Sequence, residues 1–368
     1  MSYTNRAVDE ISSKLHGAID FIRIGSDANC ATEYREHLFS ERVKKCANRA
    51  ELESLIRRTR VFVGTTTAFS SARPLFQLKR FSLAIVDEAG QILEPSLLAL
   101  LSMQHEGASA IRKFVLIGDH KQLPAVVQQR QQESEVTDEM LREIGLTDCR
   151  LSLFERLLWR YGGDPAVTYM LTRQGRMHPD IARFPNEAFY GGKLQAVPLP
   201  HQQEESPQPR VTFYDVLPRE GEVADKANQA EADVIARLVR EIYEREWRTF
   251  SETETVGIIV PYRNQIATIR NTIDRLGIPA LHGITIDTVE RYQGSQRHYI
   301  IYGFTVKYFY QLRFLTDATF VEGETVIDRK LNVAMTRAQE YLMLVGNARL
   351  LKTNDVFARL IDFAYLRK

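Results

Sequence analysis

The sequence predicts an α/β fold of two domains with mostly parallel sheets, and three observations support that prediction. Short runs of apolar and β-branched residues recur along the chain, and they are continuous rather than alternating, as in strands buried on both faces. Helical patterns lie between these runs, which favours open α/β sheets. The 368 residues also exceed what one hydrophobic core usually holds, so two domains are the default.

The predicted strands are distributed over both halves of the chain. We expect them at 61–66, 83–89, 114–119, 167–172, 255–262, 283–289, 299–305 and 341–347. Two amphipathic helices are clear between the later runs. The stretch NQAEADVIARLVREIYERE puts Ile235, Leu238 and Ile242 on one face, and RNQIATIRNTIDRLG stops at Gly277.

Turn-forming residues indicate where the domains divide. The sequence RYGGDP follows a helical pattern, so we expect domains at 1–160 and 161–368. Two polar stretches, 128–139 and 197–210, are predicted loops. In both domains the polar motifs described below are expected just after strands, where open α/β sheets bind ligands.

Composition excludes several classes of protein. Hydrophobic residues are 44% and charged residues 26%, an ordinary balance, and no run approaches the roughly 20 apolar residues of a membrane span. No secretion signal is visible, and the three cysteines form no metal-type pair, which favours a cytoplasmic protein without zinc or iron–sulfur. The net charge of +1 means that any nucleic-acid binding must use a local basic surface.

The stretch FSLAIVDEAGQ, residues 81–91, ends a predicted strand in two adjacent carboxylates, Asp87 and Glu88. A carboxylate at a strand end can hold Mg²⁺, and its neighbour can orient or deprotonate an attacking water. The alternative is a pair of solvated acids that begin a turn. This stretch alone does not separate the two interpretations.

Later stretches place further polar groups beside predicted strands. FVLIGDHKQLPAV offers Gln122, which could reach a γ-phosphate. LTRQGRMHP offers Arg176 and LNVAMTRA offers Arg337, and such arginines can stabilise charge on a transferring phosphoryl group. In DTVERYQGS, Gln293 and Gly294 suit a close approach of backbone to ligand. Taken singly, each stretch also fits an ordinary loop, surface arginine or tight turn.

In their order, these stretches resemble the motifs of the superfamily 1 helicases, in the 5′→3′ branch (superfamily 1B) that includes nonsense-mediated-decay RNA helicases and replication helicase–nucleases. TNRAVDEI is similar to motif Ia, VFVGTTTAFS to motif Ic, VDEAG to motif II and GDHKQLPAV to motif III. RQGRMHP is similar to motif IV, VPYRNQ to the nucleic-acid motif that follows it, DTVERYQGS to motif V and LNVAMTRA to motif VI. The motifs keep the family's order across nearly the whole chain.

The resemblance implies two RecA-like domains of the P-loop NTPase fold, with motifs Ia to III in the first and IV to VI in the second. It implies an ATP-dependent helicase, a hydrolase that uses ATP and Mg²⁺ and moves 5′→3′ on single-stranded nucleic acid, with DNA expected before RNA. Asp87, as the Mg²⁺ ligand, and Glu88 would be catalytic. Gln122 would sense the γ-phosphate, and Arg176 and Arg337 would be arginine fingers from the second domain.

The resemblance also implies contacts to nucleotide and strand. Gln293, Gly294 and Gln296 would bind nucleotide. Contacts that go mainly to phosphates suit a motor that reads no sequence. The residues implied along the strand are Thr4, Asn5, Thr65, Thr66, Pro261, Tyr262 and Thr288. A charged helical insertion at about 28–58 is a solvated helical pair in the simplest interpretation, and a small subdomain over the nucleic-acid channel by resemblance.

Three positions depart from the family's pattern. The residue before Arg176 is usually aromatic but is Gly175 here, which puts one base-stacking contact in doubt. Motif V usually continues with Glu and Asp, where this chain has Gln296 and His298. A ribose or phosphate contact there is therefore in doubt.

The 368 residues do not contain the phosphate loop, which needs Gly, four residues, then Gly-Lys and Ser or Thr. The only Gly-Lys is Gly192-Lys193, which Leu194 follows, and Glu187 stands where the first glycine should be. We therefore expect an incomplete first domain, the rest of a helicase upstream, including the Ser/Thr that shares Mg²⁺ with Asp87, and little ATPase activity in this chain alone. The alternative is a natural, non-hydrolysing protein that binds single strands. Pathway and oligomeric state stay open.

Overall fold

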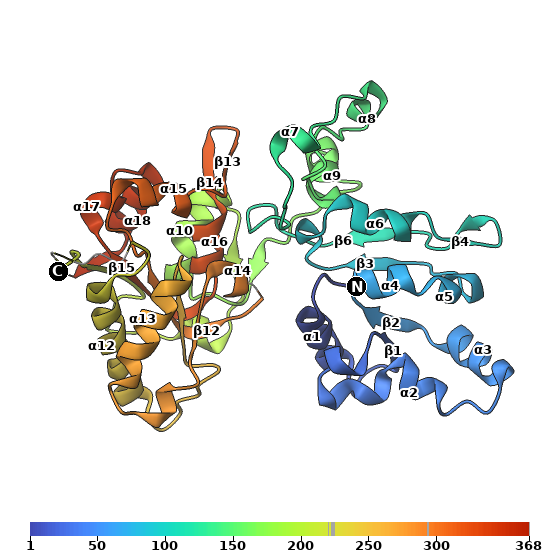
Figure 1. Ribbon diagram of the computed structural model, residues 1–368, viewed down its shortest axis with the longest axis horizontal. Coiled ribbons are helices and arrows are strands. Elements are labelled where there is room, and N and C mark those ends of the chain that lie inside the picture. Colours follow the sequence, from blue (N-terminus) through green and yellow to red (C-terminus); the bar gives the residue numbers. More distant parts are fainter. Residues whose placement is uncertain (220, 222–224, 293, 368) are drawn as a thin grey trace. The chain divides into compact units, whose positions relative to one another are not determined.

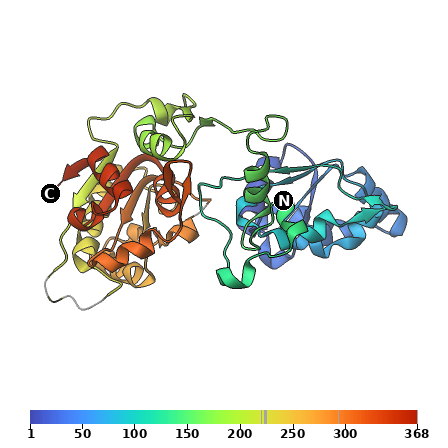
Figure 2. The same ribbon diagram turned by 90° about the horizontal axis from the view of Figure 1, so that it is seen from above.

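The computed structural model describes residues 1–219, 221, 225–292 and 294–367. The chain forms two compact units, which Figures 1 and 2 show from two directions. Unit 1 comprises Met1–His120 and Pro124–Tyr169, and unit 2 comprises Lys121–Leu123 and Met170–Lys368. Each unit is an α/β structure built on parallel strands, so the predicted fold class is confirmed.

Unit 1 contains two pairs of parallel strands and the helices that follow them. Its strands are β1 (Phe21–Ile24), β2 (Val61–Gly64), β3 (Ala84–Val86), β4 (Gln104–His105), β5 (Ala108–Ser109) and β6 (Phe114–Leu116). Its helices are α1 (Asn5–Leu15), η1 (Asp27–Asn29), η2 (Thr32–His37), α2 (Phe39–Val43), α3 (Arg49–Arg58), α4 (Thr66–Ser71), α5 (Arg73–Leu78), η3 (Ala89–Gln91), α6 (Glu94–Leu101), α7 (Gln131–Ser134), α8 (Glu139–Glu143) and α9 (Leu153–Tyr161).

The parallel pairs of unit 1 are β1–β2 and β3–β6. Ile22 pairs with Phe62 in the first, and Ile85 pairs with Val115 in the second. Figure 1 shows the amino terminus between β2 and β3. The strand predictions at 61–66, 83–89 and 114–119 are confirmed, although the observed strands are shorter, and the helices η2, α2 and α3 account for most of the expected helical insertion.

Unit 2 is built on one six-stranded sheet. Its strands are β7 (Arg173–Gln174), β8 (Gln195–Ala196), β9 (Val211–Asp215), β10 (Val256–Ile259), β11 (Thr285–Asp287), β12 (Arg297–Gly303), β13 (Thr319–Glu322), β14 (Thr325–Asp328), β15 (Ala338–Gly346) and β16 (Tyr365–Arg367). Its helices are α10 (Pro179–Phe189), α11 (Pro200–Gln203), α12 (Gln229–Glu246), α13 (Arg263–Asp274), η4 (Pro279–Leu281), α14 (Val289–Tyr292), η5 (Phe309–Gln311), α15 (Leu312–Leu315), α16 (Arg329–Met335), α17 (Ala348–Leu351) and α18 (Asp355–Phe363).

The sheet of unit 2 has the order β11-β10-β12-β15-β9-β16, and all its pairs are parallel. Alternate residues of β12 pack on opposite sides. Ile300 and Tyr302 join a core with α10, α16 and α18, whereas Tyr299 and Ile301 join a core with α12 and α13. Both faces are therefore covered, which explains why these strands read as continuous apolar runs.

Two expectations about this part of the chain are wrong. The run at 167–172 is not a strand, and Val167 and Tyr169 are 66% and 88% exposed. A strand needs a hydrogen-bonded neighbour, and this run instead spans the change from unit 1 to unit 2. The same change, after Tyr169, lies beyond the boundary expected at 160, and Lys121–Leu123 belongs to unit 2.

None of the helices in the described part of the chain combines the length and the apolar character that crossing a bilayer requires.

Candidate nucleotide and strand sites

The two predicted catalytic acids lie directly after β3 in unit 1. The Asp87 N–H donates to the carbonyl of Met1 at 2.8 Å. Glu88 has a left-handed backbone with φ of 53°, which is uncommon for a residue other than glycine and is found preferentially at functional sites. Gln91 Nε2 donates to Glu88 Oε2 at 2.7 Å, so the Glu88 side chain is oriented. Both acids are partly exposed at the carboxyl end of the strand.

The turns after β3 and β6 lie against each other. The Ala89 N–H donates to the Ile117 carbonyl at 2.8 Å. A Cβ added to Gly118 would lie 3.0 Å from the Gly90 nitrogen, so this close approach of backbones requires glycine. The turn that carries Asp87 is thus braced by its neighbouring strand.

Unit 2 brings together five polar residues from four sequence segments, which we call the arginine cluster: Gln122, Arg176, Gln296, Thr336 and Arg337. Arg337 Nη2 donates to Gln122 Oε1 at 3.2 Å and to Thr336 Oγ1 at 3.0 Å. Arg176 Nη1 donates to the Thr336 carbonyl at 3.1 Å, and its Nε donates to Gln296 Oε1 at 3.1 Å. Arg337 is buried, with 2% of its surface exposed.

The arginine cluster lies at the amino ends of two neighbouring strands. Arg297 of β12 pairs with Ala338 of β15, and these residues directly follow Gln296 and Arg337 in sequence. Gln296 and Arg337 therefore precede strands, as the sequence already indicates for Arg337, whereas Arg176 follows β7 as expected. The reason is local, because α16 ends at Met335 and leaves Arg337 at the entrance to β15.

Gln122 reaches the cluster because its segment is anchored in unit 2. Asn332 Nδ2 donates to the Lys121 carbonyl at 2.8 Å, and Lys121 Nζ donates to the Phe189 carbonyl at 2.8 Å and forms an ion pair with Glu322. Leu123 is buried in the core of unit 2. No hydrophobic period in the sequence indicates this placement.

The residues of the motif V stretch, DTVERYQGS, are only partly described by the structure. Gln293 lies outside the described residues. Gly294 has φ of 78°, the left-handed region that favours glycine. His298, at one departure from the family's pattern, contacts Glu340 with 2.6 Å between Nδ1 and Oε1. This hydrogen bond raises the pKa of His298 and lowers the pKa of Glu340, so the two form an ion pair of their own.

The strand-binding candidates of unit 1 lie at the heads of two helices. Thr4 Oγ1 accepts from the Ala7 N–H at 3.2 Å and caps α1, whose first residue, Asn5, is exposed. Thr65 Oγ1 accepts from the Ala68 N–H at 3.1 Å and caps α4. Because Ser2 pairs with Thr65, the segments that lead into these helices are neighbours.

The strand-binding candidates of unit 2 lie at the carboxyl ends of its β-strands, whereas Gln296 and Arg337 of the arginine cluster lie at the amino ends. Pro261 and Thr288 follow β10 and β11, which pair at Ile259 and Asp287. Their position after adjacent parallel strands makes them available to one ligand, and both are partly exposed.

Two candidates need correction. Thr66 is 1% exposed, because it begins α4 beneath the Ser2 segment, to whose carbonyl its N–H donates. Tyr262 is 8% exposed, and its ring stacks on Phe314 with centroids 4.9 Å apart. Neither side chain offers a surface to a nucleic-acid strand. The apolar packing partner of Tyr262 is far along the chain, so the sequence could not show it.

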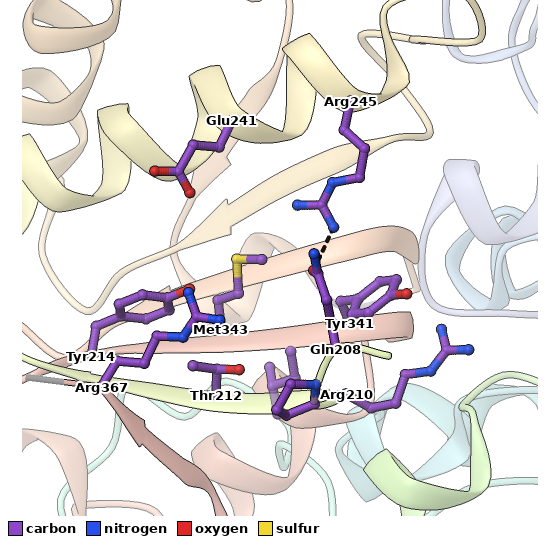
Figure 3. Close-up of a pocket in the computed structure, with 11 residues that line it drawn as sticks. Gln208, Arg210, Thr212, Tyr214, Glu241, Arg245, Tyr341, Met343 and Arg367 are labelled. Atoms are coloured by element: carbon purple, nitrogen blue, oxygen red, sulfur yellow. Dashed lines mark hydrogen bonds between the residues drawn. The ribbon is translucent and has the colours of Figure 1, made fainter. Parts of the chain in front are cut away.

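A separate small pocket in unit 2 contains none of the predicted site residues. Figure 3 shows Arg210, Arg245 and Arg367 around it with Glu241, and Arg245 Nη1 donates to Gln208 Oε1 at 2.6 Å. Its volume of about 70 Å³ is well below the roughly 300 Å³ at which ligand pockets begin. The pocket is therefore too small for a nucleotide.

Comparisons with known proteins identify the family. Two family models, each described as "AAA domain", match residues 149–349 and 40–130. The chain is 30% identical over 395 positions to the DNA replication ATP-dependent helicase/nuclease DNA2 of Xenopus laevis, covering 98% of this chain and 34% of that protein. It is 29% identical over 298 positions to Helicase sen1 of Schizosaccharomyces pombe, covering 78% and 16%. A solved structure of PRRSV helicase matches 94% of this chain and 46% of that chain at 13% identity, with a TM-score of 0.41.

The chain therefore belongs to the AAA domain family, within the superfamily 1 helicases, and the resemblance that the motifs indicate is confirmed. It spans about a third of the length of the Xenopus laevis relative.

Proposed function

We propose that this chain is the motor portion of an ATP-dependent superfamily 1 helicase that moves 5′→3′ along a single nucleic-acid strand. The arginine cluster is the observation that carries the proposal. A nearly fully buried guanidinium is costly unless it is hydrogen-bonded, and Arg337 is held at fixed geometry beside Gln122 and Thr336. Such a preorganised arginine is what phosphoryl transfer uses.

The acids of unit 1 and the arginines of unit 2 are each assigned a role in ATP hydrolysis. Asp87 presents a partly exposed carboxylate at a strand end, the kind of oxygen ligand that Mg²⁺ takes, and the bound ion would neutralise phosphate charge. Glu88, oriented by Gln91, would accept a proton from the attacking water. Arg176 and Arg337 would stabilise charge that develops on the transferring phosphoryl group. Gln293, Gly294 and Gln296 stay our candidates for nucleotide binding.

A nucleic-acid strand would contact exposed and partly exposed groups that follow β-strands or the β-bridge of Ser2. In unit 1 these are Thr4, Asn5 and Thr65, where helix amino ends favour phosphate. In unit 2 they are Pro261 and Thr288. Phosphate contacts of this kind do not read sequence. We favour DNA because the Xenopus laevis relative is named for DNA replication, and a cytoplasmic location because the three cysteines are unpaired.

Nucleotide binding tests the role of Arg176. In Arg176→Gln the affinity for a fluorescent ATP analogue with Mg²⁺ is expected to fall about tenfold, since one charge-assisted contact is worth about 1.5 kcal/mol or more. The matched control is Arg173→Gln, which neutralises an exposed arginine on the same segment and should change affinity little. Equal losses in the two variants would contradict the assignment.

A second candidate function is a non-hydrolysing protein that holds single strands, favoured by the absence of a phosphate-loop pattern from the 368 residues. Titration of a labelled strand with and without the ATP analogue separates the two. A motor should change its strand affinity when nucleotide binds, whereas the binding protein should not.

A further inference from the structure

Three side chains of unit 1 form a group of metal-ligand type, which we call the histidine cluster: His16, Glu36 and His37. Each offers one donor atom, and the three donor atoms lie within 4.8 Å of one another. His16 directly follows α1, whereas Glu36 and His37 end η2. Because β1 and η1 separate them along the chain, the sequence shows no ligand motif here.

The ring of His37 is held on β1. It stacks on the ring of Phe21, with centroids 4.0 Å apart and planes inclined by 11°, and its side chain is 11% exposed. The next residue, Leu38, forms a parallel bridge with Arg23 of β1. Because the ring is packed and the neighbouring backbone is paired, the directions of the two ring nitrogens are fixed.

A hydrogen bond decides which nitrogen of His37 can bind a metal. Nδ1 lies 3.3 Å from the carbonyl oxygen of Phe21. A carbonyl oxygen only accepts, so Nδ1 carries the proton and the lone pair of the neutral ring is on Nε2. Histidines that bind metals usually donate their other ring N–H to a carbonyl or carboxylate in this way.

The other two members of the cluster face this lone pair. His16 Nδ1 lies 3.1 Å from His37 Nε2, and Glu36 Oε1 lies 3.7 Å from the same nitrogen. Two ligands of a tetrahedral zinc ion, with bonds of about 2.0–2.1 Å, stand roughly 3.3 Å apart. The two observed separations bracket that value. The side chain of Glu36 is 63% exposed, so it can adjust to bind the same ion.

The donor atoms select the class of metal. Two imidazole nitrogens and one carboxylate oxygen suit Zn²⁺, whereas Mg²⁺ and Ca²⁺ take oxygen ligands. The expectation of no zinc rests on the cysteines and does not cover a site made of histidines. His16 and Glu36 are exposed, so water can supply a fourth ligand.

The contact between the two histidines has a simpler explanation, a hydrogen bond between neutral rings. His16 would then carry its proton on Nδ1 and donate it to His37 Nε2. With a metal bound, both of these nitrogens are ligands, and the proton of His16 is on Nε2 instead. The two explanations therefore predict different protonation of the His16 ring.

We propose that the histidine cluster binds one Zn²⁺ ion, which joins the end of α1 to η2. α1 already packs on the β1–β2 pair, because Val8 forms a small core with Phe21 and Val63 (Figure 1). The ion adds a cross-link between this helix and η2. It is distinct from the Mg²⁺ assigned to Asp87, and the inference does not depend on the proposed function.

Zinc binding to residues 1–368, stripped of metal with a chelator and kept reduced, tests the proposal. Competition with a fluorescent zinc chelator should show one ion per chain that millimolar Mg²⁺ does not displace. His16→Ala should weaken binding about a hundredfold or more, because even a residue that only orients a ligand contributes about ten- to a hundredfold. No saturable binding at micromolar Zn²⁺ would overturn the proposal.

The matched control is His282→Ala in unit 2. It removes an exposed histidine whose Nε2 lies 3.9 Å from Asp274 Oδ1, and it should change zinc affinity little. Equal effects of His16→Ala and His282→Ala would refute the assignment to the histidine cluster.

Nitrogen-15 NMR of the histidine rings separates a metal site from a hydrogen bond. At one equivalent of Zn²⁺, His16 Nδ1 and His37 Nε2 should shift together, and the proton of His16 should be found on Nε2. The His282 ring should not change. A His16 ring that keeps its proton on Nδ1 would show a hydrogen bond only and overturn the proposal.

Thermal unfolding gives a third readout. Zn²⁺ should raise the unfolding midpoint of the chain, because it binds the folded state, and His16→Ala should abolish that rise. His16 is exposed, so the variant should still fold. A rise of equal size in His16→Ala would place the ion elsewhere and contradict the proposal.

Discussion

Asp328 is a buried carboxyl group that caps the helix leading to the arginine cluster. It ends β14 and caps α16, the helix that leads to Arg337, through Oδ1 and the Leu331 N–H at 2.9 Å. The side chain is almost fully buried, and this burial raises its pKa to about 6 from an ordinary value near 4. The charged form is therefore disfavoured inside the fold.

The pH dependence of stability tests this carboxyl. Between about pH 4 and 6 the folded protein holds a proton on Asp328 that the unfolded chain has released, so the free energy of unfolding should fall as pH rises through that window. Two pKa units correspond to about 3 kcal/mol at most. Asp328→Asn, which keeps a capping oxygen, should flatten this part of the profile in urea unfolding. An unchanged slope in the variant would contradict the account.

At the scale of elements, the long apolar strands of unit 2 were predictable because both faces of the sheet are covered. β9 was missed, since its run Val211–Asp215 is short and follows a Pro-rich loop, although its β-branched and aromatic residues are a usable signal. The strand expected at 167–172 is wrong, because the local preference of residues for strands cannot show whether a neighbouring strand is available to pair with them. The contact of Gln122 with Arg337 depends on tertiary anchoring of Lys121–Leu123, which no local pattern encodes.

The capped head of α4 gives a prediction at this scale. Thr65→Ala should lower the free energy of unfolding by about 1 kcal/mol, because the cap to Ala68 is lost, and should also weaken binding of a single strand. Thr65→Ser, which keeps the capping hydroxyl, should retain both the stability and the strand binding of the original protein. Fluorescence anisotropy with a labelled oligonucleotide and urea unfolding measure the two effects.

The matched control for Thr65 is Ser152, which caps α9 through the Glu155 N–H and is fully buried. Ser152→Ala should cost similar stability and leave strand binding unchanged. If Ser152→Ala weakened strand binding as much as Thr65→Ala does, the effect would be one of stability alone.

At the scale of the whole molecule, the 368 residues contain the side chains that we assign to a helicase motor but not the phosphate-loop pattern. A protein of residues 1–368 is expected to hydrolyse ATP very slowly, because the loop and its lysine supply much of the positioning and charge stabilisation. A coupled ATPase assay with and without a single strand measures this. Robust, strand-stimulated turnover that disappears in Glu88→Gln would contradict the expectation.

The most direct measurement of the central claim is the binding of residues 1–368 to a labelled 20-nucleotide single strand as a function of salt. The account predicts binding at low salt that is nearly independent of sequence and weakens linearly as log K against log salt, because phosphate contacts release counterions. Because the contacts assigned here go to phosphates, a DNA strand and an RNA strand should give similar slopes. No binding at about 50 mM salt, or an affinity that salt does not change, would contradict the claim that this chain carries the strand-binding surface of a motor.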